Sequence, residues 1–132
     1  MSCTTTLWLA AVFACLLPAS GAAQFPADLQ AAMRARDSAI TKVDAATWAR
    51  LTADGFTVVQ ADGILMTKSE RLVQFKGQQP SAPTTHERLD IKHYQDVYVR
   101  RFLAGGEWVL DIWAKDAGGW RVVAVQVTAA KK

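Results

Sequence analysis

The stretch 111–128, DIWAKDAGGWRVVAVQVT, contains two strands and the turn that joins them. Gly118 and Gly119 mark the turn, and both flanking segments are rich in the β-branched and aromatic residues that favour strands. From Val122 onward the apolar residues fall on both faces of the last strand, whereas a strand at a wet surface alternates apolar with polar. The stretch therefore predicts that the C-terminal strand lies in the centre of a sheet and is covered on both sides.

Three further strands are expected to precede this one, because apolar runs alternate with turn residues from His86 onward. Gly105-Gly106 marks the turn before the stretch quoted above. The four predicted strands span residues 86–93, 97–103, 107–115 and 119–128. Further upstream, Asp62-Gly63 between two apolar runs predicts a short hairpin.

Three helices are predicted from capping residues and from apolar residues at helical spacing. The first covers 26–40, the second begins after Asp44 as N-cap and runs to about residue 53, and the third begins at the capping box TKSE, 67–70, and ends near Gly77. The order α-α-β-β-α-β-β-β-β predicts one α+β domain, with a mostly antiparallel sheet that has helices on one side.

The start of the chain predicts export. Residues 7–17, LWLAAVFACLL, form an uncharged apolar run too short to span a bilayer, and small residues follow it up to Ala23. We therefore expect a cleaved signal peptide, 1–23, and a secreted or periplasmic mature domain, 24–132, with its core at about 28–129 and no membrane segment. Cleavage would remove Cys3 and Cys15, so no disulfide is expected.

Composition and motifs argue against several classes of function. The net charge of +3 is mild and no basic stripe is present, so nucleic acid is not an expected partner. His86, which we expect to be solvated, and His93 lie seven residues apart without clustered carboxylates, so no metal site is predicted. No phosphate-binding loop, zinc motif or Ser-His-Asp order occurs, and no cofactor is expected.

Two segments carry a resemblance to a known family. DAATWARLTADGFTVVQADGILMTKSERL, 44–72, and the stretch 111–128 resemble the SnoaL-like branch of the nuclear transport factor 2-like (NTF2-like) superfamily, and more narrowly the domain of unknown function 4440. The resemblance implies a cone-shaped, curved sheet wrapped around about three N-terminal helices, as in a cystatin-like α+β roll. It also implies a pocket inside the cone and a homodimer.

The superfamily includes ketosteroid isomerases and polyketide cyclases, but the isomerase residues are not found here. The isomerases use a carboxylate base at the end of the first strand, where this sequence has Gln60, and an amide cannot accept that proton at neutral pH. Asp62 is close, but it precedes Gly63 in a turn, where aspartate is common. The first helix contains no tyrosine for an oxyanion hole. The isomerase mechanism therefore cannot be transferred, and a non-catalytic protein is favoured.

Turn positions give an expected strand register. If Asp116 pairs with Gly119, then Asp111 faces Ala124, and a tip at Gly105-Gly106 places Arg100 opposite Asp111. One face of the sheet is then apolar, and the other combines an apolar rim with polar residues at its centre, as a pocket wall does. The expected pocket residues are Tyr98, Arg100, Asp111, Trp113 and Gln126.

Asp111 has two interpretations. It is either held in a cross-strand ion pair with Arg100, or free in the pocket with a raised pKa. The leading hypothesis is a pocket for a small, largely apolar ligand in a homodimeric domain. One alternative is an isomerase, cyclase or dehydratase that uses Asp111 or His93 as acid or base. The other is a non-catalytic dimeric interaction module.

Overall fold

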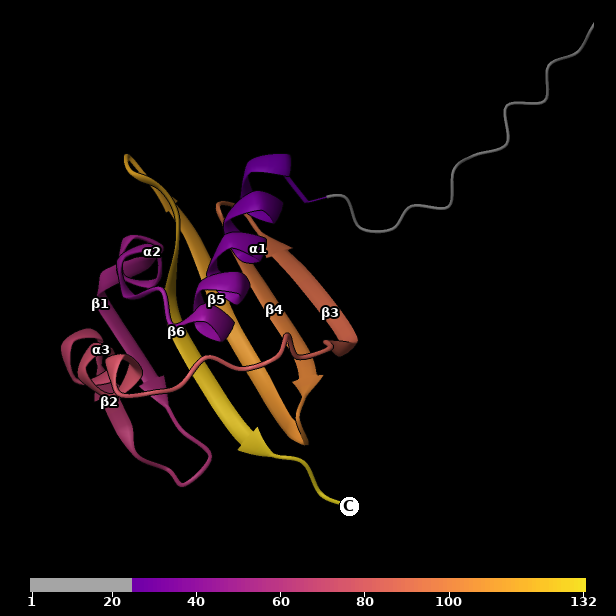
Figure 1. Ribbon diagram of the computed structural model, residues 1–132. Helices are drawn as coiled ribbons and strands as arrows, with labels where there is room; N and C mark the ends of the chain where they lie inside the picture. The colour runs from indigo at the N-terminus through magenta and orange to yellow at the C-terminus, as the bar shows by residue number, and fades with distance from the viewer. Residues whose placement is uncertain (1–24) are drawn as a thin grey trace, which may run out of the picture.

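A computed structural model describes residues 25–132 and shows an α+β fold built from three helices and one curved, open six-stranded sheet (Figure 1). The elements follow in the predicted order: α1 (Ala27–Lys42), α2 (Ala45–Arg50), β1 (Thr52–Val59), β2 (Leu65–Thr67), α3 (Lys68–Lys76), β3 (Glu87–Tyr94), β4 (Val97–Ala104), β5 (Glu107–Asp116) and β6 (Gly119–Ala129). The expected signal peptide, 1–23, lies outside the described residues.

The C-terminal strand is central, as its two apolar faces predicted. The sheet order is β2-β1-β6-β5-β4-β3, so β6 has a strand on each side. Its pairing with β1 is parallel, and the other four pairings are antiparallel. This arrangement confirms the predicted α+β class.

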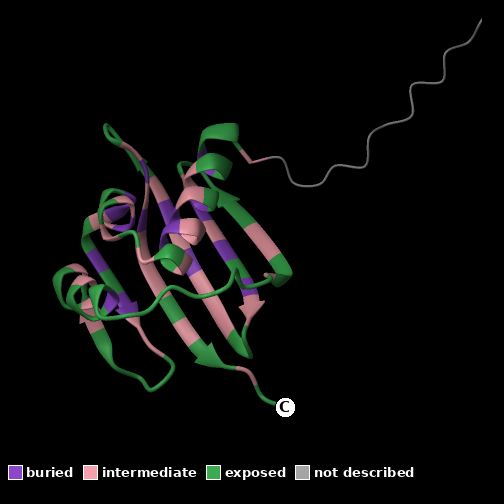
Figure 2. Ribbon diagram, in the orientation of Figure 1, coloured by how far each residue is buried: buried purple, intermediate pink, exposed green. Residues whose placement is uncertain are grey.

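All three helices lie toward one face of the sheet. Figure 1 shows α1 crossing in front of β5 and β6, with α2 and α3 beside β1 and β2. The segment 77–86 runs from α3 across the same face to β3. Figure 2 shows buried residues on the helices and on the strands that they cover. The largest fully buried side chains are Trp48, Trp113 and Phe75. Within residues 25–132, no helix is both long enough and apolar enough to cross a membrane.

Local capping residues set the helix boundaries. Asp44 caps α2 by accepting a hydrogen bond from the Thr47 backbone N–H at 3.0 Å, and Thr67 with Glu70 forms the predicted capping box of α3. Helix α2 ends at Arg50, earlier than predicted, because Thr52 already pairs with Val122 in the parallel ladder. Tertiary pairing has overridden helix propensity at this point.

A β-bulge changes the register of the last hairpin. The predicted pairs Arg100–Asp111 and Asp116–Gly119 are confirmed. The prediction that Asp111 faces Ala124 is wrong: the register shifts between Ile112 and Trp113, and Asp111 faces Val125. An extra residue in one strand moves all later side chains to the opposite face. Beyond the bulge, the predicted faces of β6 are therefore exchanged.

Candidate ligand-binding site

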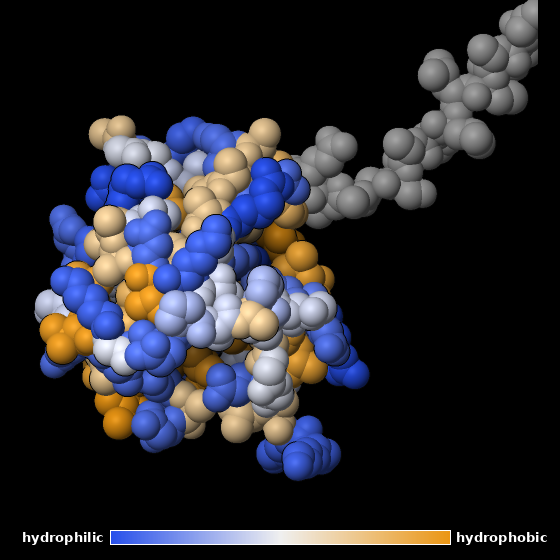
Figure 3. All heavy atoms as spheres, in the orientation of Figure 1, coloured by the Kyte–Doolittle hydropathy of each residue, from blue (hydrophilic) through white to orange (hydrophobic). Residues whose placement is uncertain are grey.

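A cavity of about 980 Å³ lies between the helical layer and the sheet. Its walls come from the three helices, the segment 77–86 and strands β1, β4, β5 and β6. In Figure 3, which views this side of the molecule, polar and apolar side chains are interspersed on the surface. The apolar part of the lining includes Trp48, Phe56, Val58, Phe102, Val109, Val125 and Val127.

A buried ion-pair network forms one end of this cavity. Arg100 on β4 donates from Nε to both carboxylate oxygens of Asp111 at 3.1 Å, and from Nη2 to Asp111 Oδ2 at 2.6 Å. Its Nη1 and Nη2 donate to the two oxygens of Asp37 on α1 at 2.9 and 3.0 Å. Burial lowers the pKa of Arg100, but the hydrogen bonds to Asp37 and the Asp111 charge outweigh burial, so the pKa rises above its usual value.

Asp111 is therefore paired rather than free. Its side chain also accepts a hydrogen bond from Trp113 Nε1 at 3.0 Å, and only 1% of the residue is exposed. A carboxylate bound by a guanidinium and an indole has few lone pairs left for a substrate. Of the two interpretations, the structure supports the cross-strand ion pair. An acid or base role would require Asp111 to be free in the cavity, and it is not.

His93 is also poorly placed for catalysis in the cavity. It is exposed on β3, and its ring stacks on Tyr98 with 4.3 Å between centroids. Its Nε2 bonds to the backbone carbonyl of Gln95. His93 does not line the cavity, so the structure offers no geometry for acid–base chemistry by this residue there.

The five expected pocket residues occupy three different environments. Arg100 and Asp111 line the cavity, whereas Tyr98 and Trp113 share their face but pack into the core. The prediction that Gln126 lines the pocket is wrong. The bulge places Gln126 opposite Leu110 on the other face of the sheet, where it is exposed.

The two positions that were compared with the isomerase base, Gln60 and Asp62, lie as the sequence predicted. Gln60 borders the cavity and donates from Nε2 to Gln74 Oε1 at 3.0 Å. Asp62 accepts a hydrogen bond from the Ile64 N–H at 3.0 Å and stabilises the turn in which Gly63 has a φ of 86°. The carboxylate nearest in sequence to Gln60 is thus engaged in turn formation.

Arg36 on α1 is a cavity residue that the sequence analysis did not identify as functional. It is 5% exposed, and its Nε has no hydrogen-bond partner among residues 25–132. The guanidinium carbon lies 5.6 Å from the Trp48 ring centroid and 6.0 Å from that of Phe56. Burial lowers the pKa of Arg36 to about 10, although the charges of Asp111 and Asp37 oppose this effect.

His86 is the second missed residue: we expected it to be solvated, and it is half-buried and lines the cavity. Its ring stacks on Phe102 at 3.9 Å between centroids, and its Nδ1 lies 3.9 Å from Asp37 Oδ2. The 77–86 segment brings it there from outside the sheet. The alternation of residues along a strand gave no signal for the position of His86. For Arg36 a signal was present: it recurs with apolar residues at helical spacing, which could have indicated that this arginine is buried.

The described part of the chain contains no group of three or more histidine, cysteine, aspartate or glutamate residues that could hold a metal ion. The buried ion-pair network of the cavity consists of one arginine between two carboxylates, and Arg100 is bonded to both of them. The arrangement can orient a ligand through hydrogen bonds and enclose its apolar part.

Comparisons with known proteins show the fold. No protein-family model and no curated protein matches the sequence. Among solved structures, an NTF2-like protein from Cytophaga hutchinsonii is 18% identical with a TM-score of 0.70, covering 76% of this chain and 94% of its own. An NTF2-like protein of unknown function in nutrient uptake from Rhodospirillum rubrum is 18% identical with a TM-score of 0.68, covering 78% and 98%.

The association domain of C. elegans CaMKII is 18% identical with a TM-score of 0.67, covering 77% of this chain and 93% of its own. At these identities the likeness defines the fold alone. The chain therefore has an NTF2-like fold, as the resemblance implied.

Proposed function

We propose that this protein is a secreted or periplasmic domain of the domain of unknown function 4440 branch that binds a small, largely apolar molecule. The observation that carries the proposal is the cavity of about 980 Å³, with its aromatic and valine lining and its fixed polar end. Such a combination is typical of small-molecule sites. Export is supported by the apolar run 7–17 and the small residues after it, and N-terminal sequencing of the exported protein tests the cleavage.

Binding is favoured over catalysis because the two acid or base candidates named from the sequence are not available in the cavity. Asp111 is saturated, and His93 lies outside the cavity. An isomerase, cyclase or dehydratase of this fold would need another acid or base. The histidine in the cavity is His86, and its ring already stacks on Phe102.

Filling the cavity should abolish ligand binding. Val125→Trp places an indole in the space that the valine borders, and we expect the affinity for the neutral fluorescent probe N-phenylnaphthylamine to fall at least about tenfold. Fluorescence titration measures the affinity. Val73→Trp is the matched control, since Val73 is 75% exposed on α3 and outside the cavity. Failure of the unmodified protein to bind the probe would contradict the proposed function.

We also propose that the protein forms a homodimer through the sheet face opposite the helices. On this face Trp108, Leu110 and Ile112 are only half-buried, and Tyr94 on the edge strand β3 is 62% exposed. Apolar surface of this kind is typical of interfaces. The CaMKII neighbour is an association domain, which is consistent with assembly by this fold.

The dimer predicts a solution mass of two chains at micromolar concentration, measured by sedimentation equilibrium. Leu110→Lys should reduce the mass to that of one chain, because a buried unpaired ammonium is costly at an interface. Val73→Lys on the exposed side of α3 should leave the mass unchanged. A one-chain mass for the unmodified protein rules out this dimer, and a dimer whose cavity binds nothing favours the interaction module.

A further inference from the structure

We infer that the ligand of the cavity is a small organic carboxylate, whose carboxylate group binds Arg36 while its apolar part lies against the sheet. The inference rests on the proposed function of the cavity and adds the chemical class of the ligand. It starts from the side chain of Arg36, a cation that borders the cavity at 5% exposure.

Arg36 lacks the partners that a buried guanidinium normally has. Residues 25–132 supply no carboxylate within 4.0 Å of it, and its Nε makes no hydrogen bond with them. The rings of Trp48 and Phe56 lie within about 6 Å of its guanidinium carbon, and the charges of Asp111 and Asp37 act on it without an ion-pair contact. A buried charge without a partner is costly and is rarely retained. The missing partner is therefore expected to come from a ligand.

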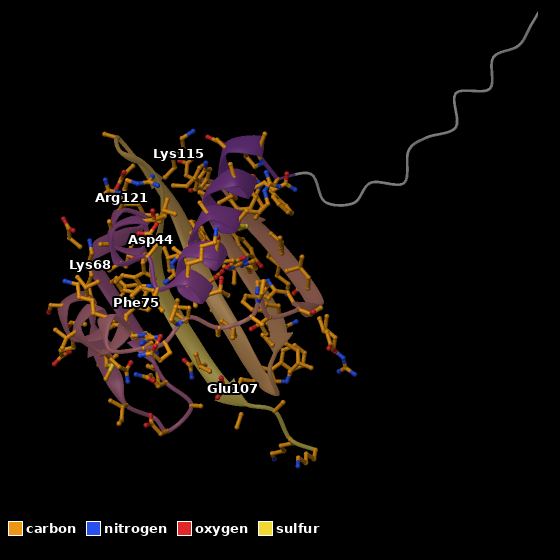
Figure 4. The ribbon with its side chains drawn as sticks, in the orientation of Figure 1. Asp44, Lys68, Phe75, Glu107, Lys115 and Arg121 are labelled. Carbon is orange, nitrogen blue, oxygen red and sulfur yellow. The ribbon has the colours of Figure 1, made fainter. Side chains whose placement is uncertain are left out.

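The carboxylates of the cavity cannot take this role. Asp37 and Asp111 are both occupied by Arg100, with Asp111 further held by Trp113. Glu107 is exposed at the start of β5. Figure 4 shows Glu107 and Lys115 at the two opposite ends of this strand. The planar fork of Arg36 thus remains unmatched by residues 25–132.

The charge balance of the cavity indicates one negative charge on the ligand. Four cations (Arg36, Lys42, Arg71 and Arg100) and three carboxylates (Asp37, Glu107 and Asp111) line it, which leaves one positive charge with His86 neutral. Arg71 donates from Nη1 to the neutral Gln74 Oε1 at 2.6 Å. A monoanion balances this charge, and a planar carboxylate matches the guanidinium fork in a bidentate geometry.

The apolar part of the lining indicates the chemical character of the rest of the ligand. Opposite the helices, Val109, Val125 and Val127 form an aliphatic surface on β5 and β6, and Phe102 adds an aromatic ring on β4. Such a surface gains free energy by covering aromatic or branched aliphatic carbon. The ligand class is therefore an apolar carboxylic acid rather than a sugar, a polyanion or a free amino acid.

A pair of competitors that differ in the anionic group tests this inference. Neutral N-phenylnaphthylamine reports occupation of the cavity, and phenylbutyrate or phenylbutanol displaces it. The unmodified protein is expected to bind phenylbutyrate at least about tenfold more tightly than phenylbutanol. Arg36→Met should lose this preference while still binding the neutral probe. Arg34→Met, an exposed arginine on the same helix, should keep the preference.

The outcomes separate the inference from the function on which it rests. If the probe binds but phenylbutyrate and phenylbutanol compete equally, the carboxylate assignment is overturned and the apolar cavity stands. If Arg36→Met prefers phenylbutyrate over phenylbutanol as strongly as the unmodified protein does, the role of Arg36 is overturned. If the neutral probe does not bind at all, both the cavity function and the inference are lost. Probe binding by Arg36→Met itself shows that the variant is folded.

Discussion

Replacement of Arg100 by leucine is expected to lower the free energy of unfolding by about 3–5 kcal/mol, because it leaves a buried carboxylate without its cation. Asp111 is 1% exposed and depends on Arg100 for three of its hydrogen-bonding contacts. Asp37 would lose both of its contacts with the same guanidinium. Urea denaturation followed by tryptophan fluorescence measures the change, since Trp113 lies beside the network.

Arg101→Leu provides the matched control on the adjacent residue of β4. The Arg101 side chain points to the other face of the sheet, is 52% exposed and pairs with Asp90 at 3.2 Å. Loss of an exposed ion pair is expected to change stability by no more than about 1 kcal/mol. The double variant Arg100→Leu with Asp111→Leu should recover part of the loss, because both buried charges are gone. Equal effects of Arg100→Leu and Arg101→Leu would show that the network contributes no more than a surface pair.

The sequence was sufficient to predict features that depend on local signals. The capping box at Thr67 and Glu70, the Asp62-Gly63 turn and the two glycine turns are all short-range patterns, and each lies where predicted. The Arg100–Asp111 pair followed from one uninterrupted hairpin, whose register is fixed by its turn. Elements and their order follow from such patterns, so the fold class was predictable.

The bulge in the last hairpin was not predictable, and it accounts for the error at Gln126. A bulge adds one residue to a strand without altering its composition, and the valine-rich segment 122–127 is apolar in either register. Between Val122 and Gln126 no polar residue distinguishes the two faces. The glutamine therefore lies on the opposite face from Asp111, while Val125 and Val127 take the positions at the cavity.

The other cavity residues were missed because they approach from distant parts of the chain. Arg36 and Asp37 are neighbours on α1, yet Asp37 contacts Arg100 across 63 positions of sequence. His86 arrives from a segment that has no periodic pattern. Which helix turn lies above which strand depends on packing between layers, and that packing leaves no local spacing in the sequence.

Two of the arginines that line the cavity are therefore in opposite situations. Arg100 is fully bonded, and its pKa is raised, so its charge stabilises the folded state. Arg36 is similarly buried but lacks carboxylate partners among the described residues, and its pKa is lowered. Arg100 therefore has a structural role. Arg36 is available to a ligand, and its unpaired charge lowers the stability of the ligand-free protein. Sites that bind ligands commonly reduce stability in this way.

Replacement of Arg36 by methionine is accordingly expected to stabilise the ligand-free protein by about 1–3 kcal/mol in urea denaturation at neutral pH. The lowering of the Arg36 pKa from its usual value to about 10 corresponds to about 3 kcal/mol, from which the lost contacts with Trp48 and Phe56 are subtracted.

The pH dependence follows from the same lowered pKa. Because the folded state binds the Arg36 proton less tightly than the unfolded chain, the loss of stability caused by Arg36 is complete below pH 10 and declines as the pH rises above it. The stability difference between Arg36→Met and the unmodified protein should therefore be constant from about pH 6 to 9. Arg34→Met should match the unmodified protein, and a destabilised Arg36→Met would mean that the protein itself satisfies the Arg36 guanidinium.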